Sequence, residues 1–317
     1  MRRALVTGAR GFIGRQTLPL LSERGFEVHA VTSGPVPEPE GTERWERADL
    51  LDPRAVDQLI ARVRPTHLLH LAWFAKPGEY ATSPLNMDWL GASLHLVQRF
   101  AESGGKRVVG AGTCFEYDWS HGFCREFGTP AAPSTLYGAC KHGLYATLDA
   151  FCRESGLSAA WGRIFFLYGP HEAPRRLVSS VVQALLRGEE APCSPGTQIR
   201  DFLHVRDVAG AFVHLLDSQV AGPVNIASGD PVAVKEVIAS IAEVIGRPEL
   251  VRLGALPSRE GEPHLLVADV TRLTDEVGFR PRFDLRNGIA ETVRWWRKQL
   301  MGIDPVLSPS DHPTGKP

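Results

Sequence analysis

The chain has 317 residues, 43% of them hydrophobic, which is enough to bury a large core in one or two domains. Its 35 basic and 36 acidic residues give a formal net charge of −1, a balance that argues against binding to nucleic acid or to an anionic membrane. No apolar run reaches the roughly 18 residues of a membrane span, and glycine interrupts the first segment before a signal-like core develops. We therefore expect a soluble, cytoplasmic protein.

The cysteines indicate a reduced protein. Their number is odd and none forms a Cys-x-x-Cys pair: they are Cys114, Cys124, Cys140, Cys152 and Cys193. This pattern argues against a disulfide framework and against a structural zinc site, so no metal is expected. We expect most of these side chains to be buried and to behave as small apolar groups.

Strand and helix patterns alternate through the first two-thirds of the chain. Residues with a strand pattern are 4–7, 27–32, 66–72, 107–111 and 158–166, and a further strand closes at Asp49-Leu50. Helical patterns occupy 13–24, 54–62, 85–102 and 137–154. This alternation predicts a doubly wound parallel sheet.

The last third of the chain is less regular. Helical patterns at 177–186, 234–245 and 287–300 are separated by loops rich in Pro and Gly. We expect an α/β fold, a Rossmann-type doubly wound parallel sheet with a smaller, mostly C-terminal substrate lobe. Residues 1–165 and about 203–227 would form the dinucleotide-binding domain, residues 166–202 and 228–302 the substrate-binding lobe, and residues 303–317 a flexible tail.

The first strand runs into a glycine turn, Thr7-Gly8-Ala9-Arg10-Gly11-Phe12-Ile13-Gly14. A strand that breaks into such a turn and then opens a helix offers backbone N–H groups and the positive end of the helix dipole to a pyrophosphate. Glycine is needed where the backbone approaches the phosphate and where helix packs on strand. The turn alone is also compatible with a tight turn in any α/β protein. As a cofactor site, it predicts contacts from Gly8, Arg10, Gly11, Phe12, Ile13 and Gly14.

The end of the second strand indicates which dinucleotide is bound. Folds that bind NAD usually place an acidic residue there for the ribose hydroxyls, whereas this strand ends in Thr32-Ser33-Gly34. Arg10 and the hydroxyls of Thr32 and Ser33 are able to contact a 2′-phosphate. We therefore expect NADP(H) in preference to NAD(H), the alternative for Arg10 being a solvated arginine on a loop.

The segment Asp49-Leu50 is a second candidate cofactor contact. Asp49 is able to accept a hydrogen bond from the adenine amino group. It is equally able to cap the helix that starts near Pro53, although Asp52 is better placed for that.

Tyr137 and Lys141 are four positions apart in a predicted helix, so both project from one face and the ammonium can lie beside the phenol. A free phenol titrates at about 10, and a neighbouring cation lowers that pKa. The pair suits a proton donor to a carbonyl. Taken alone, it is also compatible with an ordinary solvated helix face.

Several separated motifs resemble the extended short-chain dehydrogenase/reductases, specifically the NAD(P)-dependent nucleotide-sugar epimerase/dehydratase family. They are the glycine turn, His70-Leu71-Ala72, Thr113, Tyr137 with Lys141, Arg163 with Tyr168-Gly169-Pro170, Arg200-Asp201-Phe202-Leu203-His204-Val205, and Pro223-Val224-Asn225-Ile226-Ala227-Ser228-Gly229. They cover nearly the whole length of the chain.

The resemblance implies roles for these residues. Tyr137 would exchange a proton with a sugar oxygen, Lys141 would stabilise the phenolate and bind the nicotinamide ribose, and Thr113 would orient the same oxygen. Leu71 and Ala72 would line the cofactor site. The implied substrate-binding residues are Arg200 and Arg259, which would contact a diphosphate, together with Phe166 and Lys76. A homodimer is also implied, with the helices 85–102 and 137–154 between the subunits.

Two departures from the family narrow the chemistry. In the 4,6-dehydratases of the family, Asp-Glu follows the catalytic Thr, whereas Cys114 and Phe115 stand here. A phenyl ring is unable to act as the base, so dehydration is not expected. Cys114 is either a packing residue or one partner in a modified proton transfer like that of GDP-fucose synthases, whose His partner corresponds to Ser180 here. Phe166 replaces an Asn that contacts substrate in many relatives, which suggests a different sugar pose or nucleotide.

Three functions remain compatible with the sequence. The leading one is NADPH-dependent reduction of a 4-keto sugar nucleotide, because Thr113, Tyr137, Lys141 and a cofactor suffice for it. A nucleotide-sugar C4 epimerase with retained cofactor uses the same residues. A non-catalytic NADP-binding sensor or scaffold is the third, but it would not need the three residues together.

Overall fold

A computed structural model describes residues 2–38, 40–258 and 261–302. In this part of the chain the main sheet has seven parallel strands in the order β11-β7-β5-β4-β1-β2-β3. They are β1 (Arg3–Thr7), β2 (Glu27–Thr32), β3 (Arg44–Arg47), β4 (His67–His70), β5 (Arg107–Thr113), β7 (Ser158–Ile164) and β11 (Gly222–Ile226). Every residue of β5 is buried, because helices cover both faces of a parallel sheet.

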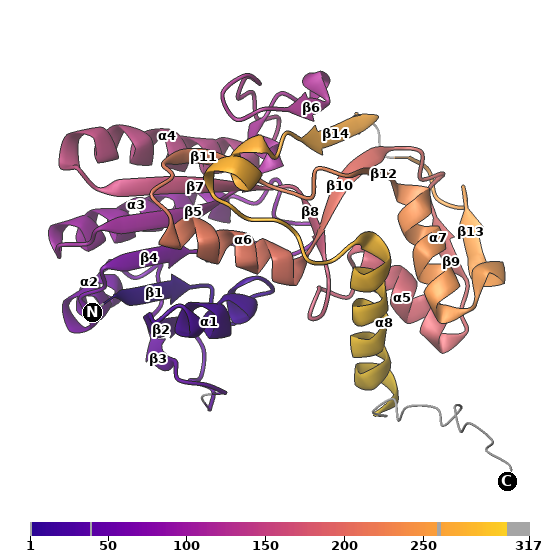
Figure 1. Ribbon diagram of the computed structural model, residues 1–317, viewed down its shortest axis with the longest axis horizontal. Coiled ribbons are helices and arrows are strands. Elements are labelled where there is room, and N and C mark those ends of the chain that lie inside the picture. Colours follow the sequence, from indigo (N-terminus) through magenta and orange to yellow (C-terminus); the bar gives the residue numbers. More distant parts are fainter. Residues whose placement is uncertain (1, 39, 259–260, 303–317) are drawn as a thin grey trace, which may run out of the picture.

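Helices form a layer on each face of this sheet (Figure 1). On one face lie α1 (Gly14–Glu23) and α6 (Val205–Asp217), and on the other lie α2 (Pro53–Val63), α3 (Leu85–Glu102) and α4 (Leu136–Ser155). Leu21 and Phe212 belong to the first hydrophobic core, and Leu59, Phe100 and Trp161 belong to the second. The observed fold confirms the predicted Rossmann-type doubly wound sheet.

A smaller lobe lies beside the main sheet (Figure 1). Its sheet has the order β12 (Pro231–Ala233), β10 (Ile199–His204), β14 (Leu265–Ala268) and β6 (Phe123–Cys124), and β8 (Phe166–Tyr168) also pairs with β10. A separate hydrophobic core joins α5 (Leu177–Arg187), α7 (Val234–Ile245) and α8 (Leu285–Met301). Strands β9 (Ala191–Cys193) and β13 (Val251–Leu253) pair beside these helices. Single turns occur at η1 (Cys114–Glu116), η2 (Trp119–His121), η3 (Pro248–Leu250) and η4 (Arg272–Glu276).

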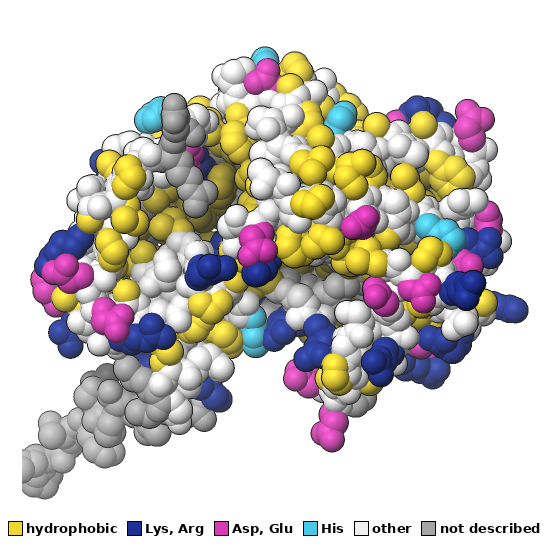
Figure 2. Space-filling model, turned by 180° about the vertical axis from the view of Figure 1, so that it is seen from behind, with side chains coloured by type: hydrophobic (Ala, Val, Ile, Leu, Met, Phe, Trp, Pro, Cys, Tyr) yellow, Lys and Arg dark blue, Asp and Glu magenta, His cyan; other side chains and the backbone are white. Residues whose placement is uncertain are grey.

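A hollow separates the two lobes on the face shown in Figure 2, and hydrophobic side chains make up most of its visible wall. The polypeptide crosses between the lobes at Phe165, where β7 of the main sheet ends and β8 of the small sheet begins. The Phe165 N–H donates to the Ile226 carbonyl oxygen at the end of β11 (3.2 Å). The single strand predicted over 158–166 is therefore divided between two sheets.

Most predicted elements agree with the structure, and the differences have local causes. The third strand ends at Arg47 rather than at Leu50, because Asp49 and Asp52 turn the chain into α2. Neither α6 nor β11 was predicted as an element, although their residues were assigned to the dinucleotide-binding part. The predicted tail, residues 303–317, lies outside the described residues.

The described ranges contain no helix long and apolar enough to cross a membrane. They also contain no cluster of three or more His, Cys, Asp or Glu side chains arranged to hold a metal ion. All five cysteines are free thiols, and only Cys152 among them is partly exposed.

Candidate active site

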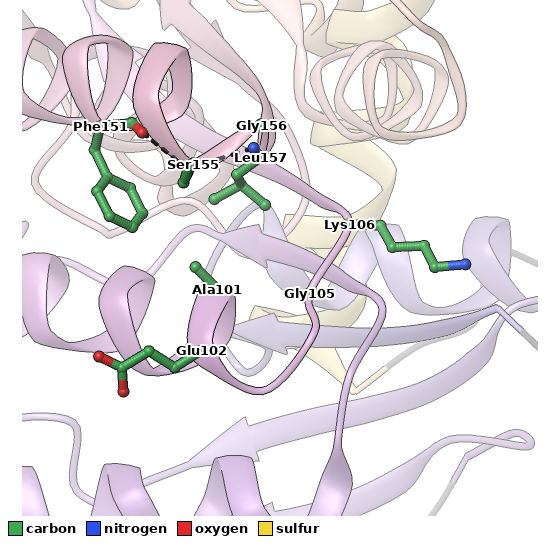
Figure 3. Close-up of a pocket in the computed structure, with 8 residues that line it drawn as sticks. All are labelled: Ala101, Glu102, Gly105, Lys106, Phe151, Ser155, Gly156 and Leu157. Carbon is green, nitrogen blue, oxygen red and sulfur yellow. Dashed lines mark hydrogen bonds between the residues drawn. The ribbon is translucent and has the colours of Figure 1, made fainter.

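The amino edge of the main sheet carries a pocket, but its position does not suit a dinucleotide site. The pocket lies between the C-terminal ends of α3 and α4 (Figure 3). Gly105 and Lys106, which precede β5, and Gly156 and Leu157, which precede β7, line it. Ligands of open α/β sheets bind outside the carboxyl ends of the strands, at the opposite edge.

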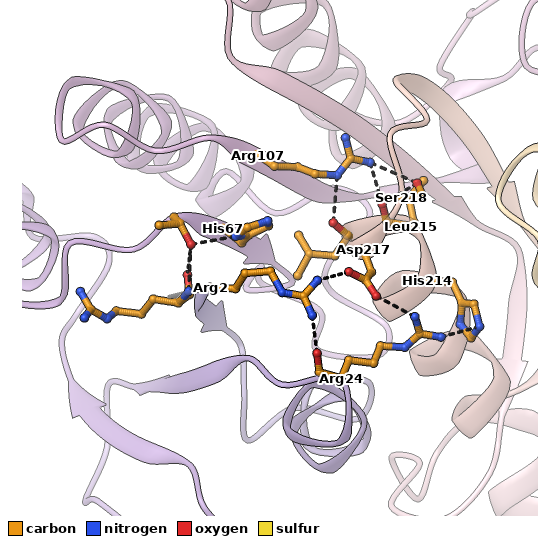
Figure 4. A network of polar contacts seen from close by, with 11 residues as sticks. Arg2, Arg24, His67, Arg107, His214, Leu215, Asp217 and Ser218 are labelled. Atoms are coloured by element: carbon orange, nitrogen blue, oxygen red, sulfur yellow. Dashed lines mark hydrogen bonds and ion pairs between the residues drawn. The ribbon is translucent and has the colours of Figure 1, made fainter.

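Polar contacts at the same amino edge fasten α6 to the sheet (Figure 4). Arg107, at the start of β5, is buried and donates to the carbonyl oxygens of Leu215 (2.6 Å) and Leu216 (3.0 Å) at the end of α6. Burial lowers the pKa of Arg107 to about 10, so the guanidinium stays charged near neutral pH. Asp217 pairs with Arg24 (2.9 Å). This network caps a helix end and leaves the carboxyl edge as the place for a site.

At the carboxyl edge, the glycine turn packs closely against the end of β4. Gly8 has a φ of +67°, and a Cβ there would lie 2.8 Å from the Ala72 nitrogen. A Cβ on Gly14 would lie 2.2 Å from the Gly8 carbonyl oxygen, and one on Gly11 2.9 Å from it. Only glycine therefore allows this approach of helix to strand.

The N-terminus of α1 fits the diphosphate of a dinucleotide. Its N-cap residue, Ile13, makes no side-chain cap, and the first turn contains no acidic residue. No capping side chain or carboxylate of this turn therefore competes with an anion for the positive end of the helix dipole. Arg15 supports the turn by donating to the Arg10 carbonyl oxygen (2.8 Å).

Arg10 lies next to the end of β2. Its Nη1 donates to the Pro35 carbonyl oxygen (3.2 Å) and would be 3.6 Å from a Cβ on Gly34. The Thr32 hydroxyl accepts from the Gly34 N–H (3.2 Å), and Ser33 is exposed. The structure thus brings together the three residues that the sequence predicts for a 2′-phosphate.

Asp49 and Asp52 were both candidates for the N-cap of α2, and the structure shows which of them forms it. Asp52 accepts from the Arg54 N–H (3.0 Å) and is the N-cap of α2. Asp49 is exposed and accepts from the Leu51 N–H (3.0 Å), while Leu50 is buried. Asp49 is therefore not the cap, and its carboxylate faces solvent.

A buried hydrogen-bond chain fixes the end of β4 beside Gly8. The Thr7 hydroxyl accepts from the N–H groups of Leu71 and Ala72, each at 3.2 Å, and contacts His70 Nδ1 at 2.8 Å. His70 Nε2 lies 2.8 Å from the Ser93 hydroxyl. Burial lowers the pKa of His70 to about 3, so the ring is neutral and serves a structural purpose.

Thr113 and Tyr137 meet at the carboxyl end of β5. Thr113 is buried, and its side chain hydrogen-bonds to that of Tyr137. Tyr137 is in the first turn of α4, which the Thr135 hydroxyl caps by accepting from the Gly138 N–H (3.0 Å). A Cβ on Gly138 would be 2.3 Å from the Phe115 carbonyl oxygen, so α4 begins in close contact with η1.

Lys141 lies one turn further along α4 and is buried. Its Nζ donates to the Ala111 carbonyl oxygen in β5 (2.7 Å) and lies 3.9 Å from the ring centroid of Trp73. Burial lowers its pKa to about 7. The sequence predicted an ammonium beside the phenol, whereas its contacts in the structure are this carbonyl oxygen and the indole ring.

Three aromatic rings surround the phenol of Tyr137, and we call Trp73, Tyr80 and Phe115 the Tyr137 cage. Their ring centroids lie 6.4, 5.0 and 5.9 Å from that of Tyr137, all nearly edge-on. Burial among these rings raises the pKa of Tyr137, and the hydrogen bond with Thr113 opposes this effect. Sequence reasoning missed Trp73 and Tyr80, whose only signal was their place after β4.

Glu116 is the acidic residue nearest to Thr113 in the chain, and both of its carboxylate oxygens already accept hydrogen bonds. Oε1 accepts from the Thr113 N–H (2.8 Å) and from Trp161 Nε1 (2.9 Å), and Oε2 accepts from Arg163 Nε (3.0 Å). Cys114 is buried, and burial raises the pKa of its thiol, so it lacks the thiolate character of a proton-transfer cysteine. This environment favours the packing interpretation of Cys114.

The predicted substrate-binding residues lie in different surroundings. Arg200 is 1% exposed and pairs with Glu262 (2.8 Å), and its guanidinium lies 5.4 Å from the centroid of the half-buried Phe166 ring. Lys76 pairs with Glu79 at the surface (2.6 Å). Arg259 lies outside the described residues.

Two further residues near the site were not predicted. Arg176 at the start of α5 lies over the Tyr80 ring, with its guanidinium carbon 5.2 Å from the centroid. His171, between β8 and α5, has a φ of +72°, and its Nδ1 lies 2.7 Å from Arg15 Nη1. Its ring also packs on Trp295 of α8, at 4.6 Å between centroids, so it connects the glycine turn with the small lobe.

Comparison with known proteins places this geometry in a family. Residues 4–227 match the model of the NAD dependent epimerase/dehydratase family. The chain is 28% identical to dTDP-glucose 4,6-dehydratase of Streptomyces niveus, over 99% of this chain and 98% of the relative. This chain therefore belongs to the NAD-dependent epimerase/dehydratase family, as its motifs predicted.

Solved structures agree with this assignment. MoeE5, determined in complex with UDP-glucose and NAD, is 31% identical with a TM-score of 0.81, over 94% of this chain and 99% of that one. UDP-glucose 4-epimerase of Thermus thermophilus, in complex with NAD, is 27% identical with a TM-score of 0.82, over 93% and 99%. The chain is thus an enzyme of this family with the Rossmann-type fold of its relatives.

Proposed function

We propose that this enzyme reduces the keto group of a 4-keto sugar nucleotide with NADPH, and that Tyr137 donates the proton. The observation that carries the proposal is the hydrogen-bonded pair of Thr113 and Tyr137, with the buried Lys141 one turn further along α4, at the sheet edge that carries the glycine turn. The relatives named above act on or bind nucleotide sugars, which supports that substrate class.

In this reduction, Thr113, Tyr137 and Lys141 would each have a separate role. Thr113 and Tyr137 hydrogen-bond the keto oxygen, Tyr137 transfers its proton to that oxygen, and the Lys141 cation stabilises the phenolate that remains. The nicotinamide supplies the hydride when the cofactor is bound. The glycine turn and the Leu71-Ala72 segment would hold the dinucleotide, and Lys141 would also bind its ribose.

The surroundings of Thr113 support reduction over dehydration. Dehydration needs an acid and a base that act on two carbons of the sugar. Phe115 offers no proton acceptor, the Cys114 thiol is held neutral by burial, and both Glu116 oxygens already bond to structural partners. Simple reduction needs none of these groups.

C4 epimerisation is a second candidate, because relatives of this chain are UDP-glucose 4-epimerases and the same three residues would suffice. An epimerase retains its cofactor and returns the hydride to the other face of the sugar. The two reactions therefore differ in whether added cofactor is consumed.

For the cofactor, we propose NADP(H) in preference to NAD(H). The support is local: Arg10 lies beside Thr32 and Ser33 at the end of β2, and this strand does not end in an acidic residue that would repel a 2′-phosphate. The family includes proteins solved with NAD, so NAD(H) is the alternative.

The deciding experiment incubates the purified protein with 4-keto sugar nucleotides of different bases and follows the absorbance of added NADPH or NADH. Stoichiometric oxidation of NADPH with formation of the 4-hydroxy sugar supports the reductase. Interconversion of UDP-glucose and its C4 epimer without net cofactor oxidation would replace it by the epimerase. Turnover in neither assay contradicts both proposals.

A further inference from the structure

The indole of Trp73 contacts the two central groups of the candidate site. Its centroid is 3.9 Å from Lys141 Nζ, and its ring meets that of Tyr137 at 6.4 Å and 73°. Trp73 follows β4 and comes from a different part of the chain than α4, which carries both partners. Its position is therefore set by tertiary structure.

The indole is held in one orientation. Its Nε1 donates to Asn86 Oδ1 (2.8 Å), and Asn86 is fully buried at the start of α3. Asn86 Nδ2 in turn donates to the carbonyl oxygens of Tyr80 (2.7 Å) and Ser83 (2.8 Å). One buried amide thus fixes both Trp73 and the backbone that carries Tyr80.

The ring faces a buried cation, and Trp73 is nearer to it than its second aromatic neighbour, Trp161, whose ring centroid lies 5.9 Å from Nζ. Among the described residues, no carboxylate lies within ion-pair distance of Lys141, and its hydrogen-bond partner is the Ala111 carbonyl oxygen. A buried ammonium is costly unless dipoles, charges or aromatic faces replace its water. The Trp73 face supplies this interaction and leaves N–H donors of the ammonium for another partner.

We propose that Trp73 is a positioning residue of the catalytic centre, whose indole face holds the Lys141 ammonium in place within the Tyr137 cage. This inference rests on the proposed function, because it assigns Trp73 a task only if Lys141 and Tyr137 carry the reaction. Trp73 acts through Lys141 and transfers no proton itself.

Other ionisable groups face Lys141 from the elements around it. Glu116 of η1 favours the charged ammonium and is itself paired with Arg163 of β7. His70 of β4 has a pKa of about 3 and is neutral in the working range, and Tyr137 lies on the same helix with a raised pKa. Lys141, with a pKa of about 7, is therefore the group of this set that titrates near neutral pH.

The direct test uses the protein without cofactor or substrate. The sequence contains six lysines, so selective ¹³C,¹⁵N-lysine labelling gives a simple NMR spectrum. A cation over an aromatic face experiences the ring current, so the Lys141 ε-methylene signal should lie upfield of the others. It should move to the ordinary lysine position in Trp73→Leu and part of the way in Trp73→Phe. Trp89→Leu is the control. The ring centroids of Trp89 and Trp73 are 6.3 Å apart, and Trp89 packs on Trp73 rather than on the ammonium.

A pH profile supplies a second readout. Removing the indole destabilises the charged form, so the Lys141 pKa and the alkaline limb of kcat should both fall by about one pH unit in Trp73→Leu. Trp73→Phe should restore part of the shift, and Trp89→Leu should leave the profile unchanged. An unshifted Lys141 signal in the wild type, or the same Lys141 pKa in wild type and Trp73→Leu, overturns the inference. An upfield Lys141 signal in a protein that turns over no nucleotide sugar would instead refute the proposed function alone.

Discussion

The phenol of Tyr137 is surrounded by carbon rather than by charge. Tyr80 and Phe115 meet its ring edge-on, and burial raises its pKa. A phenol in such a setting holds its proton until a substrate oxygen and a nearby cation make the transfer favourable. At the scale of single residues, the cage thus favours a proton donor, which is the direction required by reduction.

Replacing Tyr137 by Phe should remove the donor and little else. We expect kcat to fall by about 10²- to 10⁴-fold, with the affinity for NADPH unchanged, as measured by steady-state kinetics and fluorescence titration. Tyr145→Phe is the matched control on the same helix, since that ring packs on Trp161 at 6.0 Å. Full activity in Tyr137→Phe would remove Tyr137 from the mechanism.

Arg10→Gln tests the cofactor preference. Loss of a charged hydrogen bond to a 2′-phosphate should raise the Kd for NADPH about tenfold and leave the Kd for NADH unchanged, as measured by calorimetry. Arg44→Gln serves as the control, because that arginine side chain is 69% exposed and pairs with Glu27 on β2. Equal weakening of both cofactors would assign Arg10 to the turn itself.

The spacing of Tyr137 and Lys141 predicts that they share one helix face, and the resemblance to the family predicts Thr113 as their partner. The sequence does not locate Trp73 or Tyr80. These two lie in a segment without helical or strand periodicity, and Asn86, a residue with no chemical signature of its own, fixes them in place. The environment of Arg200 was equally hidden, because its partner Glu262 lies 62 positions away.

At the scale of elements, the start of α5 has an unusual cap. Its N-cap residue, Arg176, makes no side-chain cap, and the Ser179 N–H instead donates to Glu172 Oε2 (3.1 Å) from the preceding loop. Burial raises the pKa of Glu172 to about 8. The native state therefore binds a proton at the Glu172 carboxylate more tightly than the unfolded chain does.

The raised pKa of Glu172 makes the stability of the protein depend on pH. Since the unfolded carboxyl titrates near 4.5 and the folded one near 8, the contribution of Glu172 to stability is lost as pH rises between these values. The slope approaches about 1.4 kcal/mol per pH unit. Glu172→Gln keeps an acceptor without a titrating proton, so its unfolding free energy should lack this slope in urea titrations from pH 5 to 8. Glu189→Gln, at an exposed position of the same lobe, should retain the wild-type slope. Parallel profiles for wild type and Glu172→Gln would contradict the raised pKa.

Element prediction succeeded where a pattern is local and failed where it is not. The amphipathic segments 85–102 and 234–245 are helices with the predicted bounds. Helix α6 is buried along most of its length, so only a small part of its surface is polar and exposed. The strands of the small sheet are only two to six residues long and pair across long stretches of sequence, as β10 does with β8, β12 and β14.

At the scale of the whole molecule, the outer faces of α3 and α4 are the expected contact between two subunits. Ala146 is exposed on α4, so an arginine there should be tolerated by the fold and should oppose association. We expect a dimer for the wild type and a monomer for Ala146→Arg in size-exclusion chromatography with light scattering. Ala61→Arg, at an exposed position on α2, should remain dimeric. A monomeric wild type would contradict the expected assembly.

The contact of Gly14 with Gly8 limits how this enzyme can be altered. A methyl group at Gly14 would sit 2.2 Å from a carbonyl oxygen, and one at Gly8 would meet the Ala72 backbone. Evolution and protein engineering therefore have almost no freedom at those two sites. Arg10 points outward from the same turn, so an attempt to redesign the cofactor choice should begin with Arg10 and its neighbours at Thr32 and Ser33.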